Sequence, residues 1–134
     1  MRIVAGSRKG ARIFAPKGLD TRPTGDRVRE AVFNLLGPVD DADVLDLYAG
    51  SGAMGLEALS RGARRVTFVE SDREAAETIL RNLDKLRLEG AVVLREDAGG
   101  KPAAEAVRGR RYDLVRVDPP CARLATILPI PAAH

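Results

Sequence analysis

The chain has 134 residues, 45% of them hydrophobic and 31% charged, with a formal net charge of +3 at pH 7. This length and composition predict one domain with a buried core and argue against wholesale disorder. The single cysteine, Cys121, excludes an intrachain disulfide framework, and the only histidine, His134, leaves no cluster for a zinc site. The longest uncharged stretch, residues 124–134, is too short to span a bilayer, and no apolar signal segment is present. We therefore expect a cytoplasmic protein without a metal.

Positive charge is concentrated at the front of the chain. Residues 1–39 carry eight basic and three acidic side chains, a local net charge of +5, whereas the remaining residues have a net charge of −2. A basic segment suits nucleic acid, because neutralised phosphates release their counterions. A solvated surface that only keeps the protein soluble has the same composition. Charge alone leaves both interpretations open.

The front of the chain predicts a hairpin and a helix. Residues 2–5 and 11–14 are β-prone and flank a turn bounded by glycines. A helix capped by Thr24 follows. Its apolar side chains recur at helical spacing: Val28, Ala31, Val32 and Leu35. This stripe is expected to face the core, so that Arg27 and Arg29 lie off it.

Beyond residue 40, short apolar runs alternate with stretches that suit helices. The runs lie at residues 44–48, 66–69, 92–94 and 114–117. The clearest helix, residues 74–87, has these apolar positions at helical spacing: Ala76, Ile79, Leu80, Leu83 and Leu86. Alternating strands and helices predict a parallel sheet of right-handed βαβ units. We therefore divide the chain into a basic hairpin and helix, residues 1–39, and a Rossmann-like core, residues 40–134.

A glycine motif follows the first of these strands. Gly50, Gly52 and Gly55 fit the G-x-G-x-x-G pattern and run into a helix. Such glycines allow a tight turn, close approach of a ligand and close packing of helix on strand. Glu70 ends the next strand, twenty residues after Gly50, where a carboxylate can accept both hydroxyl hydrogens of a ribose. The pattern predicts a nucleoside-bearing cofactor, and a turn that serves only helix packing is the alternative.

Two further acids bear on which cofactor binds. Asp46 stands four residues before Gly50, placed to meet the cationic amino-acid end of S-adenosylmethionine directly or through backbone and water. Asp97 follows the third strand and is placed to accept from an adenine amine, although an ordinary cap at a strand end explains either acid. NAD needs its pyrophosphate at the helix N-terminus but no acid inside the first strand. An NAD-linked oxidoreductase is therefore the less favoured alternative.

Asp118, Pro119 and Pro120 follow the fourth expected strand. The ligand crevice of an open α/β sheet lies outside the carboxyl ends of its strands, where a cofactor and a second substrate meet. Two successive prolines fix φ and remove two N–H donors, which holds the Asp118 carboxylate and the Pro119 carbonyl as a rigid pair of acceptors. Such a pair can grip an exocyclic base amine and aim its lone pair at a sulfonium methyl. A plain turn at the strand end is the alternative.

These stretches resemble the bacterial 16S ribosomal RNA guanine-N2 methyltransferases. The stretches that carry the resemblance are TRPTGDRVREAVFNLLG (21–37), VLDLYAGSG (44–52), GLEALSRGA (55–63) and DPP (118–120). The similarity covers nearly all of residues 1–120 and includes the unusual front segment. It implies a class I S-adenosylmethionine-dependent methyltransferase fold and methylation of one guanine of 16S ribosomal RNA, naked or in an assembling small subunit.

The resemblance also implies roles by position. The cofactor is expected to contact Asp46, Gly50, Ser51, Gly52, Gly55 and Glu70, with its adenine at Asp97 and Ala98. The target base is expected at Asp118, Pro119 and Pro120. The basic front segment is expected to grip RNA through Arg8, Lys9, Arg12, Arg22, Arg27 and Arg29.

Three features depart from the family pattern. Cys121 replaces an aromatic residue that stacks on the flipped-out base, a contact worth about 1–3 kcal/mol. Arg116 interrupts an otherwise apolar fourth strand, and the chain ends fourteen residues after Pro120. We therefore expect a C-terminally truncated copy in which strand 114–117, unless the short tail pairs with it, is an exposed edge prone to self-association. A non-catalytic RNA-binding remnant is the alternative to an active enzyme.

Overall fold

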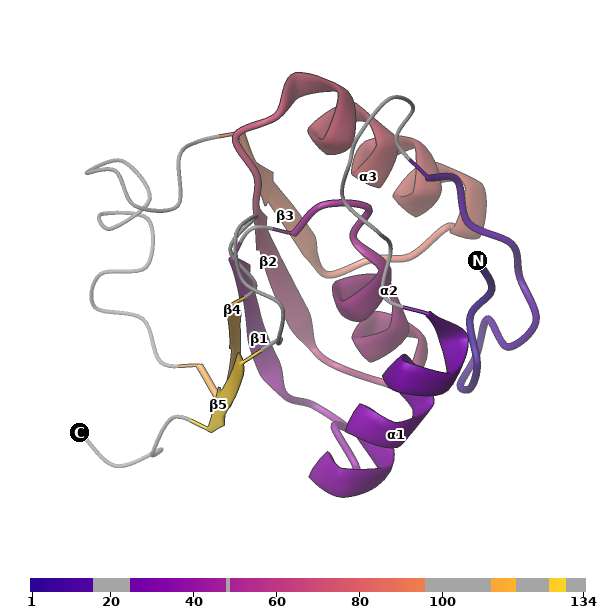
Figure 1. Ribbon diagram of the computed structural model, residues 1–134, viewed down its shortest axis with the longest axis vertical. Coiled ribbons are helices and arrows are strands. Elements are labelled where there is room, and N and C mark those ends of the chain that lie inside the picture. Colours follow the sequence, from indigo (N-terminus) through magenta and orange to yellow (C-terminus); the bar gives the residue numbers. More distant parts are fainter. Residues whose placement is uncertain (16–24, 48, 96–111, 118–125, 130–134) are drawn as a thin grey trace.

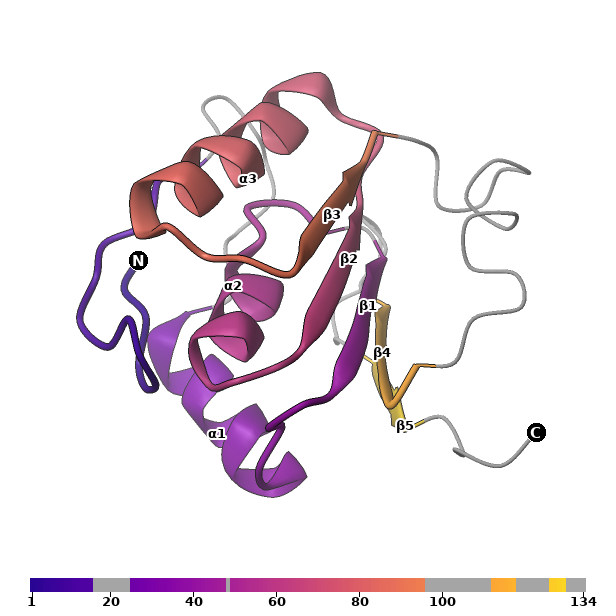
Figure 2. The same cartoon turned by 180° about the vertical axis from the view of Figure 1, so that it is seen from behind.

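The described residues form one sheet with helices on one of its faces (Figures 1 and 2). The computed structural model describes residues 1–15, 25–47, 49–95, 112–117 and 126–129. In chain order the elements are α1 (Asp26–Leu36), β1 (Asp43–Leu47), α2 (Ala53–Ser60), β2 (Arg65–Val69), α3 (Arg73–Leu86), β3 (Ala91–Leu94), β4 (Leu114–Val117) and β5 (Thr126–Pro129). The strands lie in the order β3-β2-β1-β4-β5, of which the first four run parallel. The predicted parallel sheet is confirmed.

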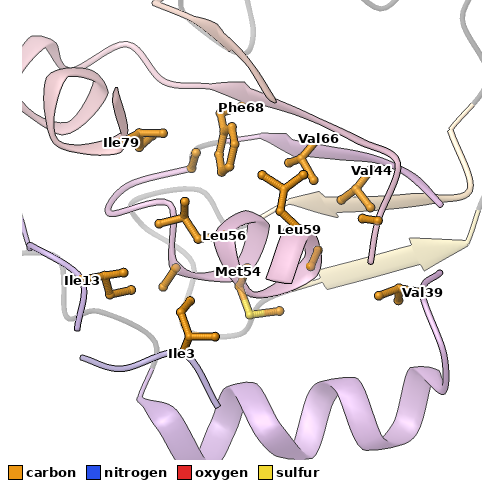
Figure 3. Close-up of a cluster of buried hydrophobic side chains, with 14 of the residues drawn as sticks. Ile3, Ile13, Val39, Val44, Met54, Leu56, Leu59, Val66, Phe68 and Ile79 are labelled. Carbon is orange, nitrogen blue, oxygen red and sulfur yellow. The ribbon is translucent and has the colours of Figure 1, made fainter. Parts of the chain in front are cut away.

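The side chains of the sheet alternate between two apolar layers. On the face covered by the helices, Val44, Val66 and Phe68 pack against Leu56 of α2 and Ile79 of α3 (Figure 3). On the opposite face lies a second cluster of buried residues: Leu45, Val69, Tyr112 and Val115. A strand buried on both faces needs a nearly continuous apolar run, which is why these strands were visible in the sequence.

The front segment packs into the same core. Arg2 and Arg12 form an antiparallel bridge, and the Ile3 amide donates to the Ala11 carbonyl at 2.9 Å, so the predicted hairpin is present as a short bridge. Ile3 and Ile13 are only 1% and 6% exposed and belong to the cluster that contains Phe68. Residues 1–15 are therefore fixed against the sheet domain by apolar burial.

A buried carboxylate ties the front segment to α2. Glu57, in the middle of α2, is fully buried and accepts from the amides of Val4 at 2.8 Å and Ala5 at 3.0 Å. Arg29 Nε lies 3.2 Å from one of its oxygens and Arg61 Nε lies 2.9 Å from the other. An ionised carboxylate survives burial only when it is paired and hydrogen-bonded, and these four donors meet that condition.

The orientation of α1 differs from the one predicted. Arg29 is fully buried, whereas Val28 is 56% exposed and Leu35 is 89% exposed. The prediction that the apolar stripe faces the core with Arg29 toward solvent is wrong. The cause is Glu57, which draws Arg29 inward and, one turn later, brings Phe33 into the core.

Arg29 also organises the start of α1. Its Nη2 atom donates to the Arg2 carbonyl and, at 2.7 Å, to Asp26 Oδ1. Burial by itself raises the pKa of the Asp26 carboxyl, but hydrogen bonds from Arg29 and the Arg2 amide, with the charge of Arg29, hold that pKa below its ordinary value. Asp26 therefore stays ionised and is part of the same cluster as Glu57.

The edge expected at β4 is covered. β5 pairs with β4 in antiparallel register, with Arg116 beside Ile127 and Leu114 beside Pro129. Strand 114–117 was expected to be an exposed edge unless the tail pairs with it, and the antiparallel pairing of β5 meets that condition. Self-association through an exposed sheet edge stays a prediction.

Replacing Arg29 by methionine should destabilise the protein by about 3–5 kcal/mol, because it removes one partner of a buried ion pair. The free energy of unfolding measured in urea tests this. The matched control is Arg73→Met, which breaks an exposed pair with Glu77 and should cost below about 1 kcal/mol. Equal losses in the two variants would contradict the role given to Arg29.

Candidate functional site

The loop between β1 and α2 is shaped by two glycines. Gly50 and Gly52 have φ of 59° and 80°, a region that residues with a side chain rarely adopt, and Gly52 caps the N-terminus of α2. The Gly52 amide donates to the Ala49 carbonyl at 2.9 Å, which closes a tight turn at the carboxyl end of β1. Gly50 and Ser51 remain half-exposed. The loop therefore presents backbone to a ligand at a helix N-terminus, where anionic or polar groups bind well.

Glu70 connects this loop to the start of α3. One of its carboxylate oxygens accepts from the Gly50 amide at 2.8 Å, and the other accepts from the Asp72 amide at 2.7 Å. The side chain is half-buried, and each oxygen has a second lone-pair site for a further hydrogen bond. Glu70 and the glycine loop were predicted to act together, and the structure brings them into direct contact.

Gly55 has a different role from Gly50 and Gly52. A Cβ atom on Gly55 would lie 2.2 Å from Cε1 of Phe68 and 2.9 Å from Cγ1 of Val66. The absence of a side chain lets α2 approach β2 closely. Gly55 therefore supports the loop through packing beneath it, as the third glycine of such a motif does.

Asp46 forms a buried ion pair with Arg116. Asp46 is 1% exposed, Arg116 is 6% exposed, and Arg116 Nη1 lies 3.0 Å from Asp46 Oδ1. The two residues are direct neighbours in the register of β1 and β4 and point toward α2, beside a cavity of about 10 Å³, the size of one water molecule. Arg116 is thus accommodated by a partner that the sequence did not reveal.

Several expected site residues lie outside the described part of the chain: Asp97, Ala98, Asp118, Pro119, Pro120, Cys121 and Arg22. Val117, the residue before Asp118, lies beside Leu47 in the register of β4 and β1. The last described residue of β4 is therefore level with the end of β1, three residues before Gly50.

The basic residues of the front segment differ in their exposure and in their partners. Lys9, Arg12 and Arg27 are exposed. Arg8 is half-buried and donates to the Leu86 carbonyl at 2.5 Å and the Arg87 carbonyl at 3.0 Å, at the end of α3. Arg29 is buried against Glu57, so the prediction that it grips RNA is wrong, because no phosphate can reach its guanidinium.

The sequence did not reveal the polar residues that bind the front segment through hydrogen bonds. Glu57 and Ser60 lie in α2 among buried apolar residues, and Ser60 Oγ accepts from the Arg8 amide at 2.9 Å. Asn82, fully buried in α3, donates to and accepts from the backbone of Phe14. An acid and an amide on otherwise buried helix faces were the available signals.

The strand order β3-β2-β1-β4, the glycine turn after β1 and the acid at the end of β2 define a class I S-adenosylmethionine-dependent methyltransferase fold. A more particular assignment comes from comparison with known families. The model of the family described as Conserved hypothetical protein 95 matches residues 1–130, so the chain belongs to that family.

The chain is similar to ribosomal RNA methyltransferases. It is 44% identical over 122 residues to YlbH of Bacillus subtilis (strain 168), proposed to be an rRNA methyltransferase, covering 90% of this chain and 66% of that protein. It is 43% identical over 124 residues to Ribosomal RNA small subunit methyltransferase D of Escherichia coli (strain K12), covering 92% of this chain and 61% of that protein. The resemblance inferred from the motifs is confirmed.

A solved structure agrees. The structure of yhhF from Escherichia coli, proposed to be a methyltransferase, matches with a TM-score of 0.76 at 40% identity, covering 90% of this chain and 64% of that one. The chain thus spans less than two thirds of each of these three relatives. Within the described ranges, no helix is long and apolar enough to cross a membrane, and no three His, Cys, Asp or Glu side chains group as metal ligands.

Adding a methyl group at Gly55 should damage the fold beneath the loop. Gly55→Ala forces the new Cβ into the Phe68 ring, and overpacking of this kind costs about 1–3 kcal/mol. Gly25→Ala, where a Cβ meets nothing within 4 Å, should cost below about 1 kcal/mol as an N-cap change. Thermal unfolding of both variants measures the difference, and equal shifts would contradict the packing role.

Proposed function

We propose that this chain is the cofactor-binding part of an enzyme that methylates the exocyclic N2 amine of a guanine in 16S ribosomal RNA with S-adenosylmethionine. The observation that carries the proposal is the Glu70 carboxylate bonded to the Gly50 amide at the carboxyl edge of the sheet. The identity of the chain with small-subunit rRNA methyltransferases supports the choice of substrate. An oxidoreductase finds no support among these relatives.

The residues at this edge fit the proposed cofactor. S-adenosylmethionine supplies an electrophilic methyl group on a sulfonium centre. Glu70 holds two oxygens half-exposed beside the glycine loop, where they can accept the hydroxyl hydrogens of a ribose. Gly50 and Ser51 are half-exposed and offer backbone to the rest of the cofactor, and Gly52, which is buried, shapes the turn that presents them. Asp46 is buried against Arg116, so we assign it an indirect role through the loop that follows β1.

The remaining residues of the proposal are assigned to the adenine of the cofactor, to the target base and to the RNA backbone. The adenine is assigned to Asp97 and Ala98, and the target amine to Asp118, Pro119 and Pro120. Two acceptors at the amine would hold its hydrogens and direct its lone pair, so that catalysis rests on positioning and electrostatics. The exposed cations Lys9, Arg12 and Arg27, with Arg22, are assigned to RNA.

Transfer of a radiolabelled methyl group to small-subunit ribosomal RNA that lacks modification tests the proposal. Digestion of the product should yield N2-methylguanosine, because the acceptor pair suits an exocyclic amine. A different methylated nucleoside would overturn the assignment of the target atom. Binding of RNA and cofactor without transfer would instead identify a non-catalytic remnant.

Loss of the Glu70 carboxylate should weaken cofactor binding. Two hydrogen bonds to a charged group contribute about 2–4 kcal/mol together, so Glu70→Ala should raise the Kd for S-adenosylhomocysteine by well over tenfold. Isothermal titration measures the change. Glu89→Ala removes an exposed acid away from the loop and should leave the affinity within about twofold. An unchanged affinity in Glu70→Ala would place the cofactor elsewhere.

A further inference from the structure

Two cationic side chains of α3 lie against the ring of an aromatic side chain on the surface. The Arg81 guanidinium carbon lies 4.5 Å from the centroid of the Phe14 ring, and Lys85 Nζ lies 4.8 Å from it. Phe14 itself is 39% exposed. Ile13 is buried in the core, whereas its chain neighbours Arg12 and Phe14 are exposed. We call Arg12, Phe14, Arg81 and Lys85 the Phe14 patch.

The patch is held rigidly from below. The Phe14 amide donates to Asn82 Oδ1 at 2.7 Å, and its carbonyl accepts from Asn82 Nδ2 at 3.0 Å. Asn82 is fully buried, and Lys85 Nζ donates to the Arg12 carbonyl at 2.8 Å. Two cations with long, flexible side chains are therefore fixed before any ligand arrives. Such preorganisation lowers the entropy lost on binding.

Arg81 and Lys85 are held by a ring contact, whereas several other cations of the structure are held by ion pairs. Arg29, Arg61, Arg64, Arg73 and Arg116 each form an ion pair with an acid. Within the part of the chain that the structure describes, no ion pair joins Arg12, Arg81 or Lys85 to an acid. An aromatic ring orients a cation through its quadrupole and leaves the positive charge in place. α3 also carries two exposed acids about one turn before and after Arg81, Glu77 and Asp84.

From these observations we propose that the Phe14 patch binds the phosphate backbone of the RNA substrate, as a second contact away from the target base. The inference rests on the proposed function. α3 starts at the carboxyl edge of the sheet, and Lys85 lies twelve residues after Arg73, which at 1.5 Å per residue places it about 18 Å from that edge. That is roughly half the rise of one duplex turn, so one structured RNA can reach both places. Phosphate contacts fix position without reading sequence.

The test is a charge reversal of two patch residues. Arg81→Glu with Lys85→Glu should raise the Kd for an unmodified 16S ribosomal RNA transcript at least tenfold at about 0.1 M salt. The slope of log affinity against log salt should fall by about 1.4–1.8, as expected for two lost phosphate contacts. Arg64→Glu with Arg73→Glu changes the net charge equally and should change the Kd less than about threefold.

A second variant tests the ring itself. Phe14→Leu keeps an apolar side chain and the backbone bonds to Asn82 but removes the face that orients the cations. The Kd should rise about two- to fivefold with the salt slope unchanged, because the same phosphates are met by less ordered cations. A Kd equal to that of the parent would show that the ring has no part in binding.

Binding of S-adenosylhomocysteine distinguishes a failure of the proposed function from a failure of the proposed Phe14 patch. All variants should bind S-adenosylhomocysteine as the parent does and unfold at similar temperatures; if the double reversal does not fold, Arg81→Gln with Lys85→Gln replaces it. A parent that binds neither RNA nor cofactor overturns the proposed function. A parent that binds both, with a double variant that matches the Arg64 and Arg73 control, overturns the patch alone. Loss of binding to small-subunit particles but not to naked RNA would indicate a protein partner and would also overturn it.

Discussion

The carboxylate of Glu57 is the constraint on which the arrangement of the front segment depends. It is fully buried and accepts hydrogen bonds from two backbone amides and two guanidinium groups. If any of these four donors moved away, the carboxylate charge would be left partly uncompensated in an apolar interior, where desolvation of a charge costs several kcal/mol. Residues 4 and 5, α1 and the end of α2 are therefore held in one geometry. The basic hairpin is positioned by a group inside the fold and not by its own short bridge.

The same helix links this cluster to the cofactor loop. α2 begins at the glycine turn and ends at Ser60, which bonds to residues 5, 7 and 8 of the front segment. Gly55 lets the helix rest against Phe68, so the helix has little freedom to slide on the sheet. An eight-residue helix with both ends fixed transmits position rigidly. Residues 5–8 of the front segment and the loop proposed for the cofactor thus share α2 as a support.

The sequence predicted the parts of the fold that depend on periodicity. β1 to β4 and α3 appear within a residue or two of the expected bounds, because each carries a continuous apolar run or a helical repeat. The face of α1 was predicted wrongly, since a buried acid in another helix outweighed a regular stripe of its own residues. The sequence left open whether the tail pairs with β4, because pairing between strands is a long-range choice that local pattern does not encode.

In the candidate site, too, the local motif was predictable and the long-range contact was not. The contact between Glu70 and Gly50 followed from motif spacing, whereas the partner of Asp46 did not, because an arginine seventy residues away gives no local signal. A buried ion pair adds little net stability, and its value lies in specifying one arrangement over others. A slip of one residue between β1 and β4 would turn Arg116 to the opposite face and separate the two charges. The pair therefore fixes the register in which Val117 lies beside Leu47, and with it the height at which the segment after β4 meets the glycine loop.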